Sequence, residues 1–417
     1  MKYQAYSQIS FKKTPYYLNM SETLRNEFDV LTKVLPFKIN NYVAEHLINW
    51  ENLPDDPIYQ LIFPRKDMIS AFDFKTLSGM IKDGASALEM DMVSNMVQQK
   101  IWPAVALDED RIPKCNGDII PGLYHTFPTN LYLFPAPAVK TCHAVCNYCF
   151  RWIHHTRGKF LPETSYSDPA TPIAFLRDNP HIKDIFMTGA DPLVMTTSQV
   201  KKFTDPLINV ESLDVIRFIT KSLTYWPFRF TTDKDADELL DYFRYLKTQG
   251  KHVAIMAHIT HVNELQTDVV KEAIRRIQET GAVIRCQAPI VKNINDSAQD
   301  WTELWDTQVQ LGMFPYHMFV EADTDPNGCF QIPLAKTVAV FQEARKKATS
   351  IARAVRGPTF MNNNMRVEIL SIEEINNEKF FVLKCLQALD DKHEGKIRLY
   401  PFDPEITQIE NLRSVFE

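Results

Sequence analysis

The chain has 417 residues, 45% hydrophobic and 24% charged, an ordinary globular composition that is long enough for a large core or for two to three domains. Its net charge of −6 gives no reason to expect nucleic acid or an anionic membrane as a partner. An odd number of cysteines, seven, is not a disulfide framework, and the amino terminus has no apolar signal core, so a cytoplasmic protein is expected.

Residues 1 to about 125 are predicted to form a helical N-terminal region. Apolar residues recur at helical spacing over Asn19–Leu35, where Ser21 can start the helix, and over Thr76–Gln99. Prolines break the segment between them, at Asn52–Gln60. We therefore expect residues 1–125 to consist mostly of helices joined by proline-rich turns.

From about residue 130, short β-branched runs alternate with helical stretches. The expected strands are Leu131–Phe134, Asp184–Met187, Val215–Ile219, Val253–Ala257, Val283–Gln287 and Pro315–Val320, and the expected helices are Ala170–Arg177, Asp235–Gln249 and Thr267–Thr280. This alternation predicts right-handed βαβ units around a parallel sheet. The fold class is therefore α/β, with residues 126–335 forming a partial (β/α)6 barrel whose reacting groups lie at the carboxyl ends of the strands.

Residues 336–417 are predicted to form a small C-terminal cap. A helix is expected over Leu334–Arg353, followed by short strands such as Arg366–Leu370 and Phe380–Leu383. We expect this segment to close the partial barrel.

Three cysteines lie within eight residues, directly after the first expected strand. Their order is Cys142-x3-Cys146-x2-Cys149. Three thiolates on one short loop can bind three irons of a cubic iron–sulfur cluster and leave the fourth iron open for a ligand that is not protein. A zinc site is an alternative, because His154 and His155 could supply a fourth ligand. Three buried cysteines close together by chance are another.

The cysteine spacing, with Tyr148 before the third cysteine, resembles the signature of radical S-adenosylmethionine (SAM) enzymes. The resemblance implies a [4Fe-4S] cluster whose open iron binds SAM, and an electron that cleaves SAM to a 5′-deoxyadenosyl radical. That radical removes a hydrogen atom from a small-molecule substrate. It also implies an electron donor such as a flavodoxin or ferredoxin, and it allows a homo-oligomer.

Further segments resemble one branch of that superfamily, lysine 2,3-aminomutase, and they occur in the same order along residues 50–370. The matching segments are Asp55–Pro64, Pro121–His125, Thr188–Leu193, Ile216–Lys221, His258–His261, Gln287 with Asn295-Asp296, and Pro315-Tyr316 with Phe330–Lys336. Each segment alone is weakly specific, so the resemblance depends on the ordered set.

This resemblance also implies roles for individual residues. Gly189, Ala190 and Asp191 match the loop that meets the amino group of SAM, although Asp191 could equally be a helix cap before Pro192. His258 and Gln287 match further SAM contacts, although a histidine at a strand end is more often structural. Arg151 matches the arginine that binds the substrate carboxylate, for which a guanidinium fork is well suited; a plain surface arginine is the alternative.

The chain departs from the aminomutase where pyridoxal phosphate (PLP) and lysine would bind. Met365 or Arg366 occupies the place of the PLP lysine, and neither can form a Schiff base. The arginines that would hold the PLP phosphate are absent from the segment 126–130, and Ala322 and Asn363 replace two substrate aspartates. These losses predict a PLP-independent enzyme of mutase, lyase or dehydrogenase type that acts on a small polar substrate, such as an amino acid or its derivative.

Two alternatives stay open. One is a genuine amino acid 2,3-aminomutase with a non-standard PLP site, for which Lys336 is the nearest lysine. The other is a non-catalytic iron–sulfur or zinc protein that has kept the barrel.

Overall fold

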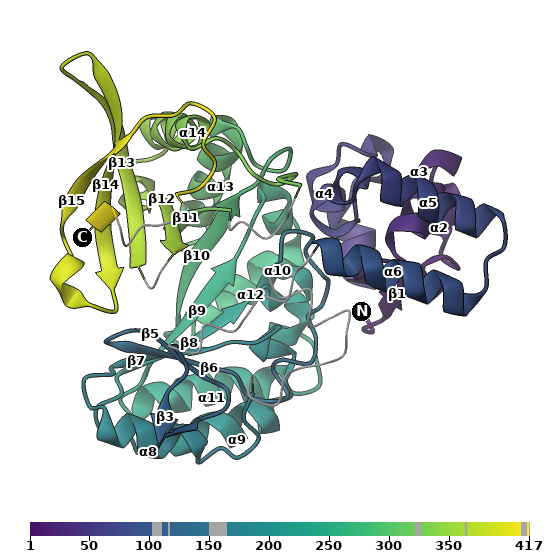
Figure 1. Ribbon diagram of the computed structural model, residues 1–417. Coiled ribbons are helices and arrows are strands. Elements are labelled where there is room, and N and C mark those ends of the chain that lie inside the picture. Colours follow the sequence, from purple (N-terminus) through teal and green to yellow (C-terminus); the bar gives the residue numbers. More distant parts are fainter. Residues whose placement is uncertain are drawn as a thin grey trace.

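The computed structural model describes residues 1–101, 111–115, 117–149, 165–321, 327–362, 365–409 and 415–416. Among these residues, eleven strands form one sheet in the order β15-β14-β13-β12-β11-β10-β9-β8-β7-β6-β5. The sheet curves into an open arc, and most helices lie on its outer side (Figure 1).

The six predicted strands are present, in sequence order and parallel. They are β6 (Asn130–Leu133), β7 (Asp184–Met187), β8 (Val215–Thr220), β9 (His252–His258), β10 (Val283–Ile290) and β11 (Phe314–Val320). Sequential order with helical crossovers is the arrangement of a partial βα barrel. The expected α/β fold is confirmed, as a mixed sheet with a parallel centre.

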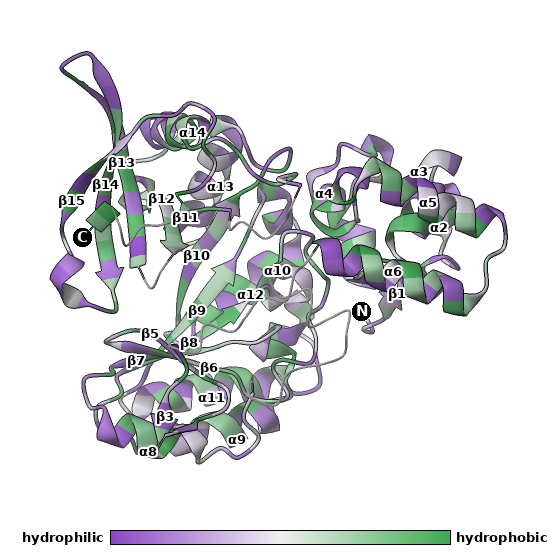
Figure 2. Ribbon diagram, in the orientation of Figure 1, coloured by the Kyte–Doolittle hydropathy of each residue, from purple (hydrophilic) through white to green (hydrophobic). Residues whose placement is uncertain are grey.

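Helices connect the parallel strands and cover the outer face of the sheet. They are α8 (Thr171–Asp178), α9 (Thr197–Ile208), α10 (Ser222–Tyr225), α11 (Ala236–Thr248), α12 (Asp268–Gln278), α13 (Ala298–Gln310) and α14 (Leu334–Lys347), with short turns η6 (Pro192–Val194), η7 (Pro227–Phe230), η8 (Val262–Leu265) and η9 (Ala352–Ala354). The prediction omitted α9 and α13 and extended α14 to Arg353, six residues too far. In Figure 2 these helices carry both apolar and polar residues, as expected when one side packs and the other meets water.

Residue alternation decides which side chains face the helices. In β8 the buried Ile216 and Phe218 alternate with the half-buried Val215, Arg217 and Ile219. Ile216 and Phe218 belong to the main hydrophobic core together with helix residues, and Arg217 does not. Since successive side chains of a strand point to opposite faces, Arg217 lies on the inner face of the arc.

The C-terminal region extends the sheet, a connection that the expectation of a closing cap did not specify. Strand β12 (Arg356–Asn362) pairs in parallel with β11, and β13 (Met365–Ile375), β14 (Glu378–Ala388) and β15 (Ile397–Pro401) continue in antiparallel order, with the short turn η10 (Asp391–His393). Their outer side has its own hydrophobic cluster with α14, which includes Leu334, Phe360 and Phe381.

At the opposite edge, β5 (Leu123–Phe127) pairs antiparallel with β6. This strand also contacts β14, and the guanidinium of Arg366 lies 5.3 Å from the centroid of its Phe127 ring. The two ends of the sheet therefore approach each other across the inner face, and the described strands enclose most of a barrel.

The N-terminal region is a helical body beside α10 and α12 (Figure 1). It comprises β1 (Ala5–Ser7), α1 (Gln8–Phe11), α2 (Pro15–Asn19), α3 (Glu22–Leu31), β2 (Lys38–Asn40), the π-helix η1 (Val43–Leu47), η2 (Trp50–Asn52), α4 (Pro57–Ile62), η3 (Lys66–Met68), α5 (Ala71–Lys82) and α6 (Ala87–Ile101), and the small pair β3 (Lys114–Cys115) and β4 (Asp118–Ile119) follows. Ser21 caps α3 as predicted, accepting from Leu24 N at 3.2 Å.

The prediction of a single helix over residues 76–99 was wrong. The segment is divided into α5 and α6, and Gly84 between them has φ of +72°. That left-handed conformation is accessible to glycine at little cost and ends a helix. The apolar spacing continued through the break because both helices turn their apolar side toward the same core.

The N-terminal body shares one hydrophobic cluster with the parallel strands. Phe11, Phe28, Phe37 and Phe63 form an aromatic group within it, with ring centroids 4.8–5.9 Å apart. The predicted boundaries at residues 125 and 335 remain predictions. None of the described helices has the length and apolar character that crossing a bilayer requires.

Candidate active site

The cysteine loop follows β6, at the carboxyl ends of the parallel strands, as predicted. Cys142, Cys146 and Cys149 are half-buried thiols. The amide of Cys149 donates to the carbonyl of Cys146 at 3.1 Å, which makes a tight turn between the last two. The loop therefore presents its sulfur atoms from a short, internally bonded segment.

Helix α4 of the N-terminal body holds one side of this loop. The backbone amide of Asn147 donates to Leu61 O at 2.8 Å, and its side-chain amide donates to Gln60 O at 3.0 Å and to Phe63 O. The last carbonyls of a helix have no partner within the helix. Asn147 therefore caps α4, and the upstream segment with Asp56 at its N-cap acquires a role, which is to fix the cysteine loop.

Strand β2 holds the other side. The carbonyl of Lys38 accepts from Val145 N at 2.9 Å, and its ammonium donates to Cys142 O at 2.7 Å and to the Thr141 hydroxyl. Burial lowers the pKa of Lys38, and the proximity of Cys142 opposes that shift. The lysine thus satisfies the carbonyl at the start of the loop.

Tyr148 joins the loop to the end of β9. Its ring is buried, and its hydroxyl lies 3.2 Å from both His258 Nε2 and Thr260 Oγ1. Gln287 is the cross-strand partner of His258, so the two side chains lie on the same face of the sheet. The structure therefore brings the predicted His258 and Gln287 together beside the cysteine loop.

Gly189 and Ala190 pack against the segment that leads into the cysteine loop. A Cβ at Gly189, whose φ is +141°, would lie 2.9 Å from the backbone of Ala138, and Ala190 N donates to Ala138 O at 2.9 Å. Glycine is needed here for close backbone packing. The loop after β7 thereby fixes the entry to the cysteine loop.

Asp191 is a fully bonded, buried carboxylate that is 2% exposed. Its oxygens accept from Leu193 N at 3.0 Å, Thr220 Oγ1 at 2.7 Å, Lys221 N at 2.9 Å, and Ser222 N and Oγ at 3.1 and 3.0 Å. Burial raises the pKa of Asp191, and these hydrogen bonds oppose the shift. The alternative interpretation of Asp191 as a cap is confirmed, since it is the N-cap of η6.

Lys221 and Glu264 form a buried ion pair that sequence reasoning missed. Lys221 Nζ lies 3.1 Å from Glu264 Oε2, and the Glu264 side chain is 0% exposed. Glu264 also accepts from Thr260 N at 2.7 Å and from Thr224 Oγ1 at 2.6 Å. A signal for it existed, because Lys221 directly follows β8 and Glu264 belongs to the capping box of η8.

This ion pair lies within electrostatic reach of Cys146. Burial raises the pKa of the Cys146 thiol to about 12, Lys221 opposes the shift, and Cys149 and Glu264 add to it. A bound metal cation would favour the thiolate, as metal coordination deprotonates thiols. The donor set therefore fits a group that brings positive charge to these sulfurs.

No three His, Cys, Asp or Glu side chains converge on one metal position within the described ranges. The three cysteines of a cubic cluster each bind a different iron, so they need not converge in that way. Several predicted residues lie outside the described residues, namely Arg151, His154, His155, Ala322 and Asn363.

The positions weighed for PLP are occupied by other interactions. Met365 is buried, and Arg366 donates to Gln387 Oε1 at 2.9 Å. Lys336 Nζ pairs with Asp296 Oδ2 at 2.6 Å, with its side chain 51% exposed. Lys336 therefore already serves a surface ion pair with Asp296.

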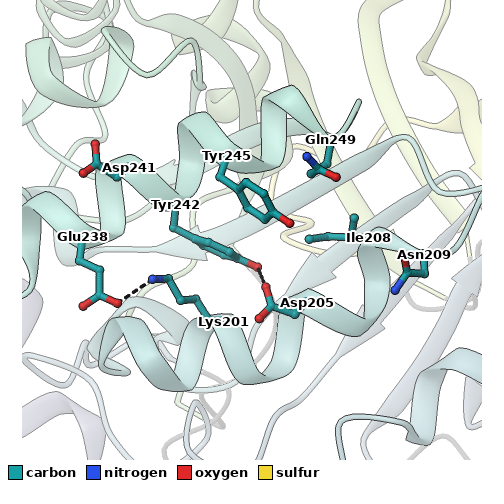
Figure 3. A pocket seen from close by; sticks show the side chains of 9 residues that line it. All are labelled: Lys201, Asp205, Ile208, Asn209, Glu238, Asp241, Tyr242, Tyr245 and Gln249. Atoms are coloured by element: carbon teal, nitrogen blue, oxygen red, sulfur yellow. Dashed lines mark hydrogen bonds and ion pairs between the residues drawn. The ribbon is translucent and has the colours of Figure 1, made fainter.

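A hollow of about 830 Å³ on the outer surface lies between α9 and α11 (Figure 3). Its polar groups bond one another: Lys201 pairs with Glu238 at 2.6 Å, and the Tyr242 hydroxyl donates to Asp205 at 2.6 Å. It lies on the helix-covered side of the sheet, away from the cysteine loop, and its paired charges offer no reactive group.

No protein-family model matches the chain. Over 404 residues it is 24% identical to a protein of Aquifex aeolicus named putative L-lysine 2,3-aminomutase, and the match covers 94% of each chain. The L-lysine 2,3-aminomutase of Bacillus subtilis is 24% identical over 61% of this chain and 50% of its own. That of Clostridium subterminale is 21% identical over 60% of this chain and 54% of its own. The matched part is thus about half the length of the last two relatives.

Among solved structures, SuiB from Streptococcus suis, bound to its precursor peptide SuiA, is similar with a TM-score of 0.35 and 14% identity. The match covers 74% of this chain and 66% of that chain. A likeness of this size has no bearing on the chemistry of the site.

Proposed function

We propose that this chain, which is similar to proteins named L-lysine 2,3-aminomutase, is a radical SAM enzyme that removes a hydrogen atom from a small polar substrate without PLP. The three thiols of Cys142, Cys146 and Cys149 would bind three irons of a [4Fe-4S] cluster. When bound, the cluster and SAM supply a 5′-deoxyadenosyl radical, which is the hydrogen acceptor.

One observation supports this proposal most directly. The cysteine loop is fixed at the strand ends by contacts with three parts of the protein. Asn147 and Lys38 connect it to the N-terminal body, Tyr148 connects it to β9, and Gly189 packs on the segment before it. A cluster ligand loop must keep its geometry while the bound groups change charge, and such second contacts orient ligands.

The remaining predicted residues take roles around this loop. We propose that His258, Gln287 and the backbone of Gly189 and Ala190 contact SAM. These residues lie at the carboxyl ends of the parallel strands, next to the cysteine loop. Asp191 acts as a positioning residue, because its hydrogen-bonding capacity is already used by the protein. Arg151, two residues after Cys149, is assigned to the substrate carboxylate on its resemblance alone.

The absence of PLP is supported by the side chains at its expected place. Met365 and Arg366 carry no amine that can form an imine, and Lys336 is paired at the surface. Without an imine, the 1,2-amino shift is disfavoured, which leaves elimination, dehydrogenation, epimerisation or another rearrangement. We propose that the enzyme works in the cytoplasm with a flavodoxin- or ferredoxin-type electron donor and an amino acid or derivative as substrate.

Anaerobic reconstitution with iron and sulfide tests the proposal. The reduced wild-type protein should bind iron and release 5′-deoxyadenosine from SAM, and Cys146→Ala should lose the release by at least about 100-fold, because one iron loses its thiolate. Cys115→Ala is the matched control, since Cys115 is exposed. Release by Cys146→Ala at the wild-type rate would show that the ligands are misassigned.

A further inference from the structure

The inner face of the sheet carries arginines at positions where barrels usually carry branched apolar residues. Alternation places Asp184 and Phe186 of β7, Arg217 of β8 and Arg285 of β10 on this face. Their neighbours in sequence, such as Ile185, Ile216 and Ile284, belong to the outer core. The inner face of this arc therefore carries charged side chains among its apolar ones.

Aromatic rings on the same face support these guanidinium groups. The Arg217 guanidinium lies 4.7 Å from the Phe186 ring centroid, and that of Arg285 lies 5.1 Å from the ring centroid of Tyr316. Arg366 reaches the Phe127 ring from the opposite end of the sheet, at 5.3 Å. Guanidinium stacking on an aromatic face fixes the group without using its hydrogen-bond donors.

His317 of β11 is 3% exposed and is the cross-strand partner of Gln287 in β10 and of Arg356 in β12. Burial lowers the pKa of His317, and Arg366, Arg356, Arg217 and Arg285 lower it further. Along a flat sheet β8 and β11 would be roughly 14 Å apart, three strand spacings of about 4.8 Å. The electrostatic effect of Arg217 on His317 therefore indicates that the curvature of the sheet turns both side chains toward one space.

Two carboxylates near this group already have partners. Asp184 forms an ion pair with Arg217, and Glu368 Oε1 accepts from Gly357 N at 3.0 Å. Within the described ranges, Arg285 and Arg356 form no ion pair, and His317 Nδ1 and Arg366 Nε are buried without a hydrogen-bond partner. Converging like charges and unsatisfied donors are costly unless an anion completes them.

We propose that Arg217, Arg285, Arg366 and His317 bind an oxyanion group of the substrate, a carboxylate or a phosphate, which is distinct from the carboxylate assigned to Arg151. This inference deepens the proposed function, on which it rests. Arg285 is two residues before Gln287 on the same face, so it lies about 6.7 Å deeper in the arc. A small molecule can thus place its anion at the arginines while its reacting hydrogen lies near His258 and Gln287.

The proposal is tested by titration calorimetry of the anaerobically reconstituted full-length protein, with inorganic phosphate and with succinate as probes. At least one probe should bind with a stoichiometry of one, and Arg285→Gln should weaken it about tenfold or more. Arg275→Gln is the control, because Arg275 is an exposed residue of α12 paired with Glu272. Tighter phosphate binding identifies a phosphate ester as substrate, and tighter succinate binding identifies a carboxylate.

Two outcomes overturn the proposal: neither probe binds, or Arg275→Gln weakens binding as much as Arg285→Gln does. If Arg285→Gln does not fold, as judged by near-ultraviolet circular dichroism, Arg366→Gln takes its place with the same expected effect. Calorimetry measures anion binding directly, so its result does not depend on whether the protein cleaves SAM. Anion binding without 5′-deoxyadenosine release would support this subsite and reject the proposed reaction. Release of 5′-deoxyadenosine without anion binding would reject the subsite alone.

Discussion

Asp191 illustrates how one residue can serve a site without touching what binds there. Five protein donors surround its carboxylate, and three of them come from Lys221 and Ser222 at the end of β8. The sequence suggested a SAM contact and a cap, which are compatible, and the structure shows the cap; the SAM contact stays a prediction. The carboxylate thereby fixes the start of the segment that carries Lys221, whose ammonium lies within electrostatic reach of Cys146.

At the same scale, Asp184 makes stability depend on pH. Burial raises its pKa from 3.8 to about 6, and Arg217 opposes that shift. Between pH 4 and pH 6 the folded protein therefore holds a proton that the unfolded chain has released, so this residue's contribution to the free energy of unfolding falls as pH rises.

We predict that the free energy of unfolding of the wild type, minus that of Asp184→Asn, falls by on the order of 2–3 kcal/mol between pH 4 and pH 6.5 and is flat above that range. Urea unfolding at several pH values measures it. A difference that rises with pH would mean that the ion pair, and not burial, dominates the titration of Asp184.

At the scale of elements, the segment Asp56–Phe63 has a function that its sequence did not reveal. It forms helix α4, and the carbonyls at its carboxyl end accept hydrogen bonds from Asn147 in the cysteine loop. One of these acceptors, Phe63 O, lies 84 residues before Asn147 in the chain. A helix terminus always needs such partners, but only the packing of the two segments identifies Asn147 as the partner.

Asn147→Ala should destabilise the protein by about 1–3 kcal/mol, because it leaves buried carbonyls without a donor, and should reduce the iron retained after reconstitution. Asn179→Ala is the matched variant, since Asn179 donates to Phe175 O at 2.8 Å at the end of α8, away from the cysteines. Thermal unfolding and iron analysis separate the two effects. Equal iron retention in both variants would contradict the role assigned to Asn147.

At the scale of the whole molecule, the N-terminal body and the parallel strands form one core. One cluster of buried hydrophobic residues contains members from Phe11 to Val355 and includes both parts. The strands from β12 onward pack in a second cluster with α14. Elements that share a core unfold together. The N-terminal body is therefore expected to be part of the same cooperative unit as the cysteine loop.

Phe28→Ala should lower the free energy of unfolding by about 3–5 kcal/mol, because Phe28 is 2% exposed and its removal leaves a cavity. Tryptophan fluorescence and release of cluster iron should then report a single transition at the same, lower denaturant concentration. Phe72→Ala, at a residue that is 74% exposed, should change stability by less than about 0.5 kcal/mol. Iron release that stays at the wild-type midpoint in Phe28→Ala would show that the two parts unfold independently.

The sequence by itself determined the six parallel strands and the place of the cysteine loop, because strand periodicity and cysteine spacing are local properties of the chain. It did not determine that α5 and α6 are separate, since apolar spacing continues across a turn that only backbone conformation reveals. Nor did it determine that β12–β15 prolong the sheet.

Only the tertiary structure decided which distant groups meet: Lys221 with Glu264, Asn147 with α4, and Arg366 with the Phe127 ring. Each of these contacts joins residues that are far apart in sequence. Their approach is set by the curvature of the sheet and the packing of whole elements, which no window of the sequence contains.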